Sequence, residues 1–337
     1  MTRRERVLEA IRHHDTDIVP YNIKLTHQAQ DRLAAYTGDP GYMDRIGNHI
    51  TKARYDGYLL ELEDKPGYWR DHFGVTWNRN GADKDIGVIE GLVLPDPTLD
   101  GYTFPKLDED RLRREYRQVL DSAEDKCTVA TIGFSTFERA WTMRGMENLL
   151  VDMIAEPEFV SELFDAICEH NLKIIGIALD FPFDIIHFGD DWGQQKGLIM
   201  GPDHWRTHIK PRMARMFEKV KRSGRFVSLH SCGDIHELFP ELIDIGLDVY
   251  QTFQPEIYDI HTVKREFGKH LTFWGGISTQ RVLPWVTPDE VKRVARETMA
   301  VMGKGGGYIA APTHDIPGDV PPENIIALAE AFQEQTG

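Results

Sequence analysis

A histidine and a cysteine two residues apart, His230 and Cys232, stand at the end of a strand that the sequence predicts. An imidazole and a thiolate at this spacing can face one metal ion, and both ligand types suit zinc. His314 follows another predicted strand and offers a third ligand, while Glu256 offers a fourth unless water or substrate takes that position. Three protein ligands with an open position are typical of catalytic zinc. In the alternative interpretation, Cys232 is a small buried residue and His230 a hydrogen-bonded histidine.

Carboxylates follow two further predicted strands. Asp190 and Asp191 come after the strand at 185–188, and Glu138 comes after the strand at 127–134. Neighbouring side chains in extended structure point to opposite sides, so we expect one of the two aspartates to enter a pocket. Asp190 and Glu138 are the candidate catalytic acids or bases, and Asp191 is the candidate substrate anchor. The pair Asp190 and Asp191 is equally well interpreted as a helix cap or as solvated acids of a loop, and Glu138 as a favourable charge at a helix start.

Other side chains at the same strand ends are candidate substrate contacts. Aromatic residues there are able to form an apolar wall for a ring-shaped ligand, although such residues more often belong to a barrel core. Arg139 is suited to an acidic group on the substrate. The remaining predicted substrate-binding residues are Trp192, Gln195, Tyr250, Gln254 and Trp274.

The elements that must position these residues alternate between strand and helix. Seven strands are predicted, and an eighth is expected between residues 45 and 63; the seven are 18–23, 127–134, 185–188, 226–230, 249–253, 271–274 and 308–311. Helices are predicted at 2–13, 26–37, 106–122, 136–153, 157–180, 203–222, 235–244, 259–267, 288–302 and 322–334. This rhythm predicts parallel βαβ units and a (β/α)₈ TIM barrel, whose active site lies at the C-terminal ends of the strands. A doubly wound sheet is disfavoured because no glycine-rich loop follows the first strand.

Residues 64–105 interrupt the rhythm. The segment is rich in glycine, proline and aromatic residues, and the runs at 75–77 and 88–89 indicate a hairpin excursion from the barrel. We expect the whole chain, 1–337, to form one barrel domain with an N-terminal helical segment and this excursion.

Composition excludes several classes of function. A net charge of -15 over 337 residues argues against nucleic acid or an anionic membrane as the main partner. The sequence contains neither a long apolar run nor a signal-peptide pattern, and its 3 cysteines are too few for a disulfide framework. A cytoplasmic enzyme is the expected class.

With these segments identified, the sequence resembles the uroporphyrinogen decarboxylase superfamily, and within it the corrinoid-dependent methyltransferase branch. The likeness spans nearly the whole chain and is carried by FERAWTMRGMENLLVDM, GDDWGQQKGLIMGPDHWRTHIKPRM, HSCGDIHELFPELIDIGLDVY, FWGGISTQ and HDIPGDVPPENI. True uroporphyrinogen decarboxylases have an arginine-rich loop after the first strand, where this chain has Lys24-Leu25-Thr26-His27-Gln28. The resemblance therefore disfavours uroporphyrinogen as the substrate.

The methyltransferase branch carries a zinc motif of the form His-x-Cys with a distant cysteine. His230 and Cys232 match its first two members, and His314 stands at the place of the distant cysteine, where the decarboxylases also have histidine. The resemblance implies a zinc-dependent methyltransferase that moves a methyl group between a small substrate, a methoxylated aromatic by preference, and a corrinoid supplied by a separate protein. A homodimer is consistent with it. The competing interpretations are a metal-independent decarboxylase or lyase that uses Asp190 and His314, and a barrel that binds a ligand without turnover.

Overall fold

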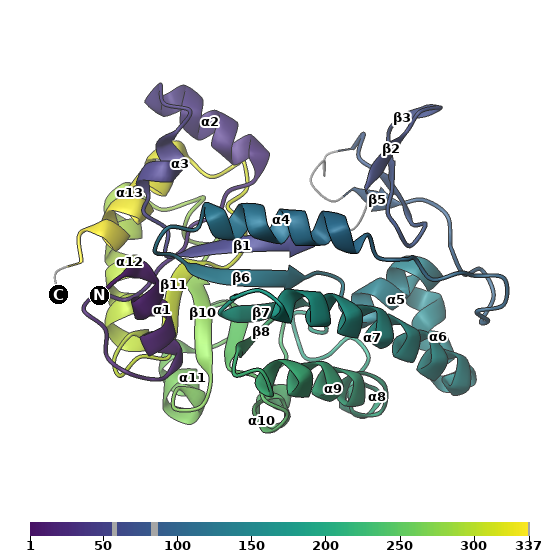
Figure 1. The fold of residues 1–337 in the computed structure, drawn as a ribbon. Helices are drawn as coiled ribbons and strands as arrows, with labels where there is room; N and C mark the ends of the chain where they lie inside the picture. The colour runs from purple at the N-terminus through teal and green to yellow at the C-terminus, as the bar shows by residue number, and fades with distance from the viewer. Residues whose placement is uncertain (56–58, 82–86, 336–337) are drawn as a thin grey trace.

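The centre of the computed structural model, which describes residues 1–55, 59–81 and 87–335, is a curved sheet of parallel strands. Each of the 7 strands pairs in parallel with its neighbour, in the order β1 (Ile50–Tyr55), β6 (Cys127–Ile132), β7 (Ile185–Gly189), β8 (Phe226–His230), β9 (Val249–Phe253), β10 (Thr272–Ile277) and β11 (Tyr308–Pro312). Helices surround this sheet (Figure 1), and the arrangement is the predicted TIM-barrel-like α/β fold. The strand expected between residues 45 and 63 is β1.

The prediction of a first strand at 18–23 is wrong, because these residues do not form a regular strand. Its residues form a connection beside β11, held by isolated bridges from Tyr21 to Ala310 and from Leu25 to Ile316. Pro20 lacks an N–H group, and the N–H of Ile23 donates to the side chain of Asn48 instead of to a strand. His49, just before β1, donates its backbone N–H to the carbonyl of Tyr21. This irregular segment therefore occupies the gap between the two edge strands of the sheet.

The helices follow most of the predicted pattern. They are α1 (Arg3–Ile11), α2 (His27–Thr37), α3 (Tyr42–Arg45), α4 (Glu109–Asp121), α5 (Phe137–Arg144), α6 (Met146–Ala155), α7 (Pro157–Leu179), α8 (Pro202–His204), α9 (Lys210–Lys221), α10 (Phe239–Asp244), α11 (Ile260–Phe267), α12 (Pro288–Met302) and α13 (Pro322–Gln333). The predicted helix at 136–153 divides into α5 and α6 at Gly145, which has φ of 87°. The predicted helix at 203–222 contains a π-helical turn, Trp205–Ile209, between α8 and α9, and a 3₁₀ turn, His236–Leu238, precedes α10.

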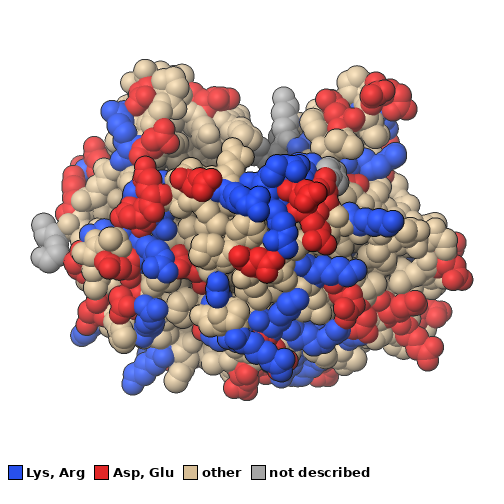
Figure 2. All heavy atoms as spheres, in the orientation of Figure 1, with Lys and Arg blue, Asp and Glu red and all other residues tan. Residues whose placement is uncertain are grey.

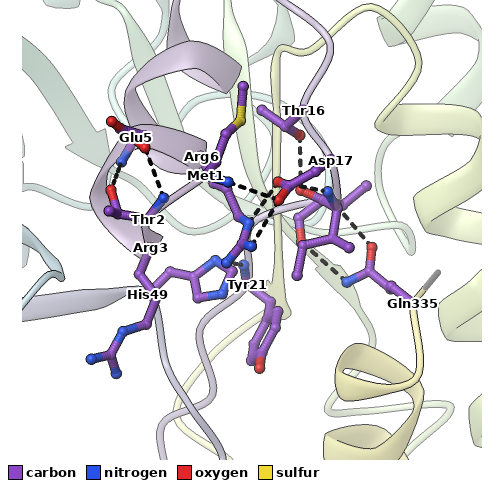
Figure 3. Close-up of polar contacts among 12 residues, drawn as sticks. Met1, Thr2, Arg3, Glu5, Arg6, Thr16, Asp17, Tyr21, His49 and Gln335 are labelled. Carbon is purple, nitrogen blue, oxygen red and sulfur yellow. Dashed lines mark hydrogen bonds and ion pairs between the residues drawn. The ribbon is translucent and has the colours of Figure 1, made fainter. Parts of the chain in front are cut away.

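Helix α1 covers the N-terminal ends of the strands. Val7, Leu8 and Ile11 pack with Ile50 and Ile185 in an apolar cluster beneath the barrel. Thr2 and Glu5 form a capping box that starts the helix. Asp17 accepts hydrogen bonds from Arg6 at 2.7 Å and from the terminal amine of Met1 at 3.1 Å (Figure 3). The N-terminal end of the barrel is thereby closed, which leaves the opposite end for a site.

The excursion forms a small antiparallel sheet of 4 strands, β2 (Leu60–Leu62), β3 (Lys65–Arg70), β4 (Thr76–Asn78) and β5 (Val88–Ile89). It lies beyond the arrowheads of β1 and β6 in Figure 1, on the C-terminal side of the barrel strands. Asp71 attaches it to the barrel, because its carboxylate accepts from the N–H groups of Phe73 and Val75 and pairs with Arg139 of α5 at 2.7 Å. The predicted hairpin is thus part of a larger sheet that begins before residue 64.

The surface carries both signs of charge. Acidic and basic side chains are interspersed over the face in Figure 2, and many form ion pairs, such as Lys210 with Glu241 at 2.6 Å. No helix in the described part of the chain has both the length and the apolar character needed to cross a membrane.

Candidate metal centre

The C-terminal ends of β8 and β11 bring together His230, Cys232 and His314. One ligand atom from each residue lies within 4.8 Å of those of the other two, and Cys232 Sγ is 3.4 Å from His230 Nε2. The rings of His230 and His314 have centroids 6.0 Å apart. Strands β9 and β10 separate β8 from β11 in the sheet, so the curvature of the barrel creates the contact. The three predicted ligands form a cluster of the size and donor chemistry that suit a metal ion.

Gln251 orients the first histidine. It lies opposite His230 in the β8–β9 pairing, and its Oε1 accepts a hydrogen bond from His230 Nδ1. This contact leaves Nε2 as the nitrogen that faces Cys232 and His314. Ligating histidines are commonly held by such an outer hydrogen bond. Sequence reasoning missed Gln251, whose only signal was its position on the strand next to His230.

The loop after β8 is fixed by side chains from its neighbours. The N–H of Cys232 donates to Asp191 Oδ1 at 2.7 Å, and the N–H of Gly233 donates to Gln254 Oε1 at 3.0 Å. Asp191 Oδ1 is also 3.5 Å from His230 Nε2. Asp191 and Gln254 were predicted to contact the substrate. In the structure they hold the backbone that presents Cys232, a role that does not require a substrate.

Burial shifts the pKa values of Cys232 and His230 in opposite directions. It raises the pKa of the Cys232 thiol well above its usual range, and the nearby Asp191 carboxylate raises it further. Burial lowers the pKa of His230, so its imidazole is neutral and able to act as a ligand. A cation among these side chains would oppose the effect of burial on the thiol, because a positive charge stabilises the thiolate.

Gly233 permits the loops after β7 and β8 to touch. Its φ is 76°, and a Cβ at this position would lie 2.2 Å from the backbone of Gly193. We predict that Gly233→Ala lowers the free energy of unfolding by at least about 2 kcal/mol, since it combines backbone strain with a collision that neither backbone can relieve. Urea denaturation measures this loss. Gly305→Ala is the matched control, because Gly305 also has positive φ but no atom within 4 Å of an added Cβ. Equal losses in the two variants would contradict the proposed loop contact.

The assignment of Asp190 as a catalytic acid needs correction. Its carboxylate is fully buried and accepts hydrogen bonds from Thr136 N and Oγ1, Phe137 N, Glu138 N and Trp192 Nε1. These donors include the first N–H groups of α5, so Asp190 caps this helix from a different strand. The alternative interpretation as a helix cap is therefore the better one, and a substrate has no access to the carboxylate.

Glu138 is better placed for proton transfer. It lies in the first turn of α5 close to Asp191, and burial together with the charges of Asp191 and Asp190 raises its pKa well above the usual range. Its charge also acts on Cys232, which places the carboxyl group near the metal cluster. A carboxyl group with a raised pKa is better suited to donate a proton than an ordinary carboxylate.

The aromatic wall predicted for the substrate is mostly core. Trp192 is fully buried against Trp205 and donates to Asp190 at 2.6 Å, while Tyr250 is fully buried and donates to the Ser231 carbonyl at 2.9 Å. Both predictions of a substrate contact are corrected, because these rings are enclosed by the packing around them. Trp274 faces the barrel interior, where its ring centroid is 4.4 Å from Lys52 Nζ.

Three other predicted residues lie outside the cluster. Glu256 accepts a hydrogen bond from Ser278 and is not one of the three grouped ligands. Gln195 is exposed in the loop after β7. Arg139 is buried in its ion pair with Asp71 and is not one of the three grouped ligands. The fourth ligand and the contact of Gln195 with a substrate stay predictions.

Two polar residues in the barrel interior were missed. Lys52, in the middle of β1, reaches Trp274, and burial and the charge of Lys24 lower its pKa to about 8. His187 of β7 is buried and contacts Ser228 Oγ at 2.8 Å. The charge of Lys52 acts on both His187 and His230, so an ammonium group lies inside the barrel near the cluster.

Comparison with known proteins identifies the family. The family model described as uroporphyrinogen decarboxylase (URO-D) matches residues 105–335. Uroporphyrinogen decarboxylases of Bacillus cereus and Geobacillus thermodenitrificans are 26% and 28% identical over 269 and 270 residues, which is 75% and 76% of this chain and 74% and 75% of those proteins. A methyltransferase from Methanosarcina mazei has the same fold, with a TM-score of 0.76 at 18% identity over 99% of both chains. Because the family model covers more than half of its length, this chain belongs to the uroporphyrinogen decarboxylase family.

Proposed function

We propose that the chain is a zinc-dependent methyltransferase that moves a methyl group between a small substrate and a corrinoid carried by a separate protein. The observation that carries the proposal is the cluster of His230, Cys232 and His314, with all three ligand atoms within 4.8 Å of one another. The similarity in fold to the Methanosarcina methyltransferase is consistent with this proposal. The preferred methyl donor is a methoxylated aromatic, as the sequence resemblance implies.

His230, Cys232 and His314 would hold the zinc ion. When bound, zinc supplies a Lewis acid that stabilises negative charge on an oxygen. Gln251 and Asp191 position the ligands, through His230 Nδ1 and the N–H of Cys232. The exposed side chain of His314 lies on the open side of the cluster, where a substrate is able to approach.

Two further side chains serve the departing oxygen. Glu138, with its raised pKa, is the proposed proton donor to the phenolate oxygen that is released when the methoxy group of the substrate gives up its methyl group. The ammonium of Lys52 places a positive charge in the barrel interior, which favours an anionic group near the cluster. These roles need only the residues of this chain and the substrate.

The test measures metal content and methyl transfer on the purified protein. Stoichiometric zinc is expected, together with formation of methylcobalamin from cob(I)alamin and a methoxylated aromatic, followed by its absorbance. Removal of zinc with a chelator is expected to abolish the transfer, and added zinc to restore it. Protein without zinc and without methyl transfer over a panel of donors would overturn the proposal.

A decarboxylase is the second candidate, because the curated relatives are named as uroporphyrinogen decarboxylases. This function predicts release of carbon dioxide that survives chelation and Cys232→Ser. Uroporphyrinogen itself fits poorly, since Lys24 in the loop after residue 23 pairs with Asp315 and no arginine precedes Arg32 there. Incubation with uroporphyrinogen and with simpler carboxylates separates the two candidates.

A further inference from the structure

A cavity on the C-terminal side of the barrel strands shares no residue with the metal cluster. It has a volume of about 310 Å³ and is lined by the C-terminal ends of β1 and β6, by α2, α5 and α7, by the connection between β3 and β4, and by β4 with the residue after it. None of its lining residues belongs to the group His230, Cys232 and His314. Its volume is at the lower end of the range for small-molecule pockets, which suits a single ring.

Buried polar atoms in the wall of this cavity lack partners. Both ring nitrogens of His72, Nε2 of His170 and Nε of Arg139 are buried and have no hydrogen-bond partner among the described residues. His170 and Arg139 are each only 5% exposed. A buried polar atom without a partner costs about 1–3 kcal/mol, so such atoms rarely gather in one place without a function. Their gathering around a cavity points to a ligand with oxygen atoms.

The imidazoles are neutral because burial lowers the pKa of His72 to about 3 and that of His170 to about 4. Their rings lie side by side, with centroids 5.7 Å apart. Each neutral ring has an N–H group to donate, and Arg139 donates from its guanidinium. These donors match the oxygens of a carboxylate.

Aromatic rings form the rest of the wall. Trp77 and Phe134 stack with centroids 5.8 Å apart, and Phe73 lies 5.1 Å from His170. The Arg139 guanidinium carbon is 4.2 Å from the centroid of Phe73. Flat apolar faces beside polar edges are suited to a flat ring that carries a polar group.

Arginine side chains contribute to the lining of the cavity. Arg54, Arg79 and Arg139 line the cavity, and Asp71 is the acidic residue among the lining residues that the structure describes. The chain as a whole has a net charge of -15. The planar guanidinium of an arginine in a cavity wall is suited to bind the carboxylate of a ligand.

We propose that this cavity binds a single-ring aromatic carboxylate. The ring packs among Phe73, Trp77 and Phe134, and the carboxylate accepts hydrogen bonds from His72, His170 and Arg139. The proposal goes beyond methyl transfer and does not depend on zinc, because the cavity and the cluster share no residue.

Isothermal titration calorimetry on the full chain tests this site with benzoate as the probe. Benzoate is expected to bind, and both benzyl alcohol, which lacks the charge, and acetate, which lacks the ring, are expected to bind about tenfold more weakly or worse. Inorganic phosphate is the fourth compound titrated, as an anion without a ring. Tighter binding of phosphate than of benzoate, or no heat with benzoate, would overturn the proposal.

Variants locate the binding. His72→Phe is expected to weaken benzoate binding by about tenfold or more, and His72→Gln, which keeps a donor, by less. His261→Phe is the matched control, because His261 is exposed on α11. Thermal melting checks that each variant folds, and His170→Gln replaces His72→Phe if the latter does not.

Unchanged affinity for benzoate in folded His72→Phe and His170→Gln would show that the ligand binds elsewhere and would overturn the proposal. Zinc content should be the same in all variants, so a failure of this site is distinct from a failure of the metal centre.

Discussion

Replacing Cys232 with serine is expected to reduce bound zinc from stoichiometric to a small fraction and to abolish methyl transfer to cob(I)alamin. Zinc prefers thiolate to hydroxyl, and Cys232 Sγ is 3.4 Å from His230 Nε2 at the centre of the cluster. Loss of an outer residue that orients a ligand typically costs 10–100-fold in metal affinity, so loss of a ligand should cost more than about 100-fold. Metal analysis after dialysis and competition with a zinc-binding dye give the affinity.

The control is Cys168→Ser. Cys168 is buried in α7, where its Sγ contacts the carbonyl of Arg212, and it is not one of the three grouped ligands. Gln251→Ala should fall between the two, since Gln251 holds His230 without being a ligand. Zinc content unchanged by Cys232→Ser would remove the metal centre from the proposal, whatever the activity.

The largest loss of stability is expected for Asp71→Ala. Its carboxylate pairs with Arg139 at 2.7 Å, and the two side chains are 5% and 6% exposed. Removal of one partner of a buried ion pair typically costs about 3–5 kcal/mol, because the remaining charge stays buried without compensation. The variant also loses the acceptor for Phe73 N, Val75 N and Trp77 Nε1. Urea denaturation followed by tryptophan fluorescence and circular dichroism measures the change.

Glu297→Ala is the matched control for this prediction. Glu297 pairs with Arg293 at 2.6 Å, but both side chains are more than half exposed, so the free energy of unfolding should change far less. Limited proteolysis adds a local measurement, since cleavage in the four-stranded sheet should accelerate in Asp71→Ala. A loss no greater than that of Glu297→Ala would contradict the role of Asp71 as the anchor of the sheet.

The barrel was predictable because its strands and helices have different apolar periods. For β1, the sequence predicted only that a strand lies between residues 45 and 63. Lys52 and Arg54 interrupt its apolar pattern, and Lys52 points into the barrel. The segment at 18–23 has the composition of a strand, yet Pro20 and the contact of Ile23 with Asn48 prevent regular pairing. Local composition does not report such tertiary partners.

The metal ligands were predictable for a different reason. The C-terminal ends of parallel strands share one face of a barrel, so residue types at strand ends indicate which side chains meet. Asp190 also lies at a strand end, but its carboxylate accepts hydrogen bonds from the first N–H groups of α5. A carboxylate in this position is therefore able to cap a neighbouring helix instead of facing a substrate. Gln251 and Lys52 lie within strands, where the sequence contains no sign that their side chains approach His230. The cavity beside His72 depends on how the excursion packs on the barrel, which no local pattern encodes.

The separation of His230 and His314 by two intervening strands has a consequence for local opening of the barrel sheet. A metal ion held by both imidazoles would be a cross-link between the middle and the end of the chain, in addition to a reactive centre. Opening of the sheet between β8 and β11 would then require loss of a ligand, and zinc occupancy would slow amide hydrogen exchange in β9 and β10. The rate of amide hydrogen exchange in these strands and the zinc occupancy of the cluster would then report on the same equilibrium.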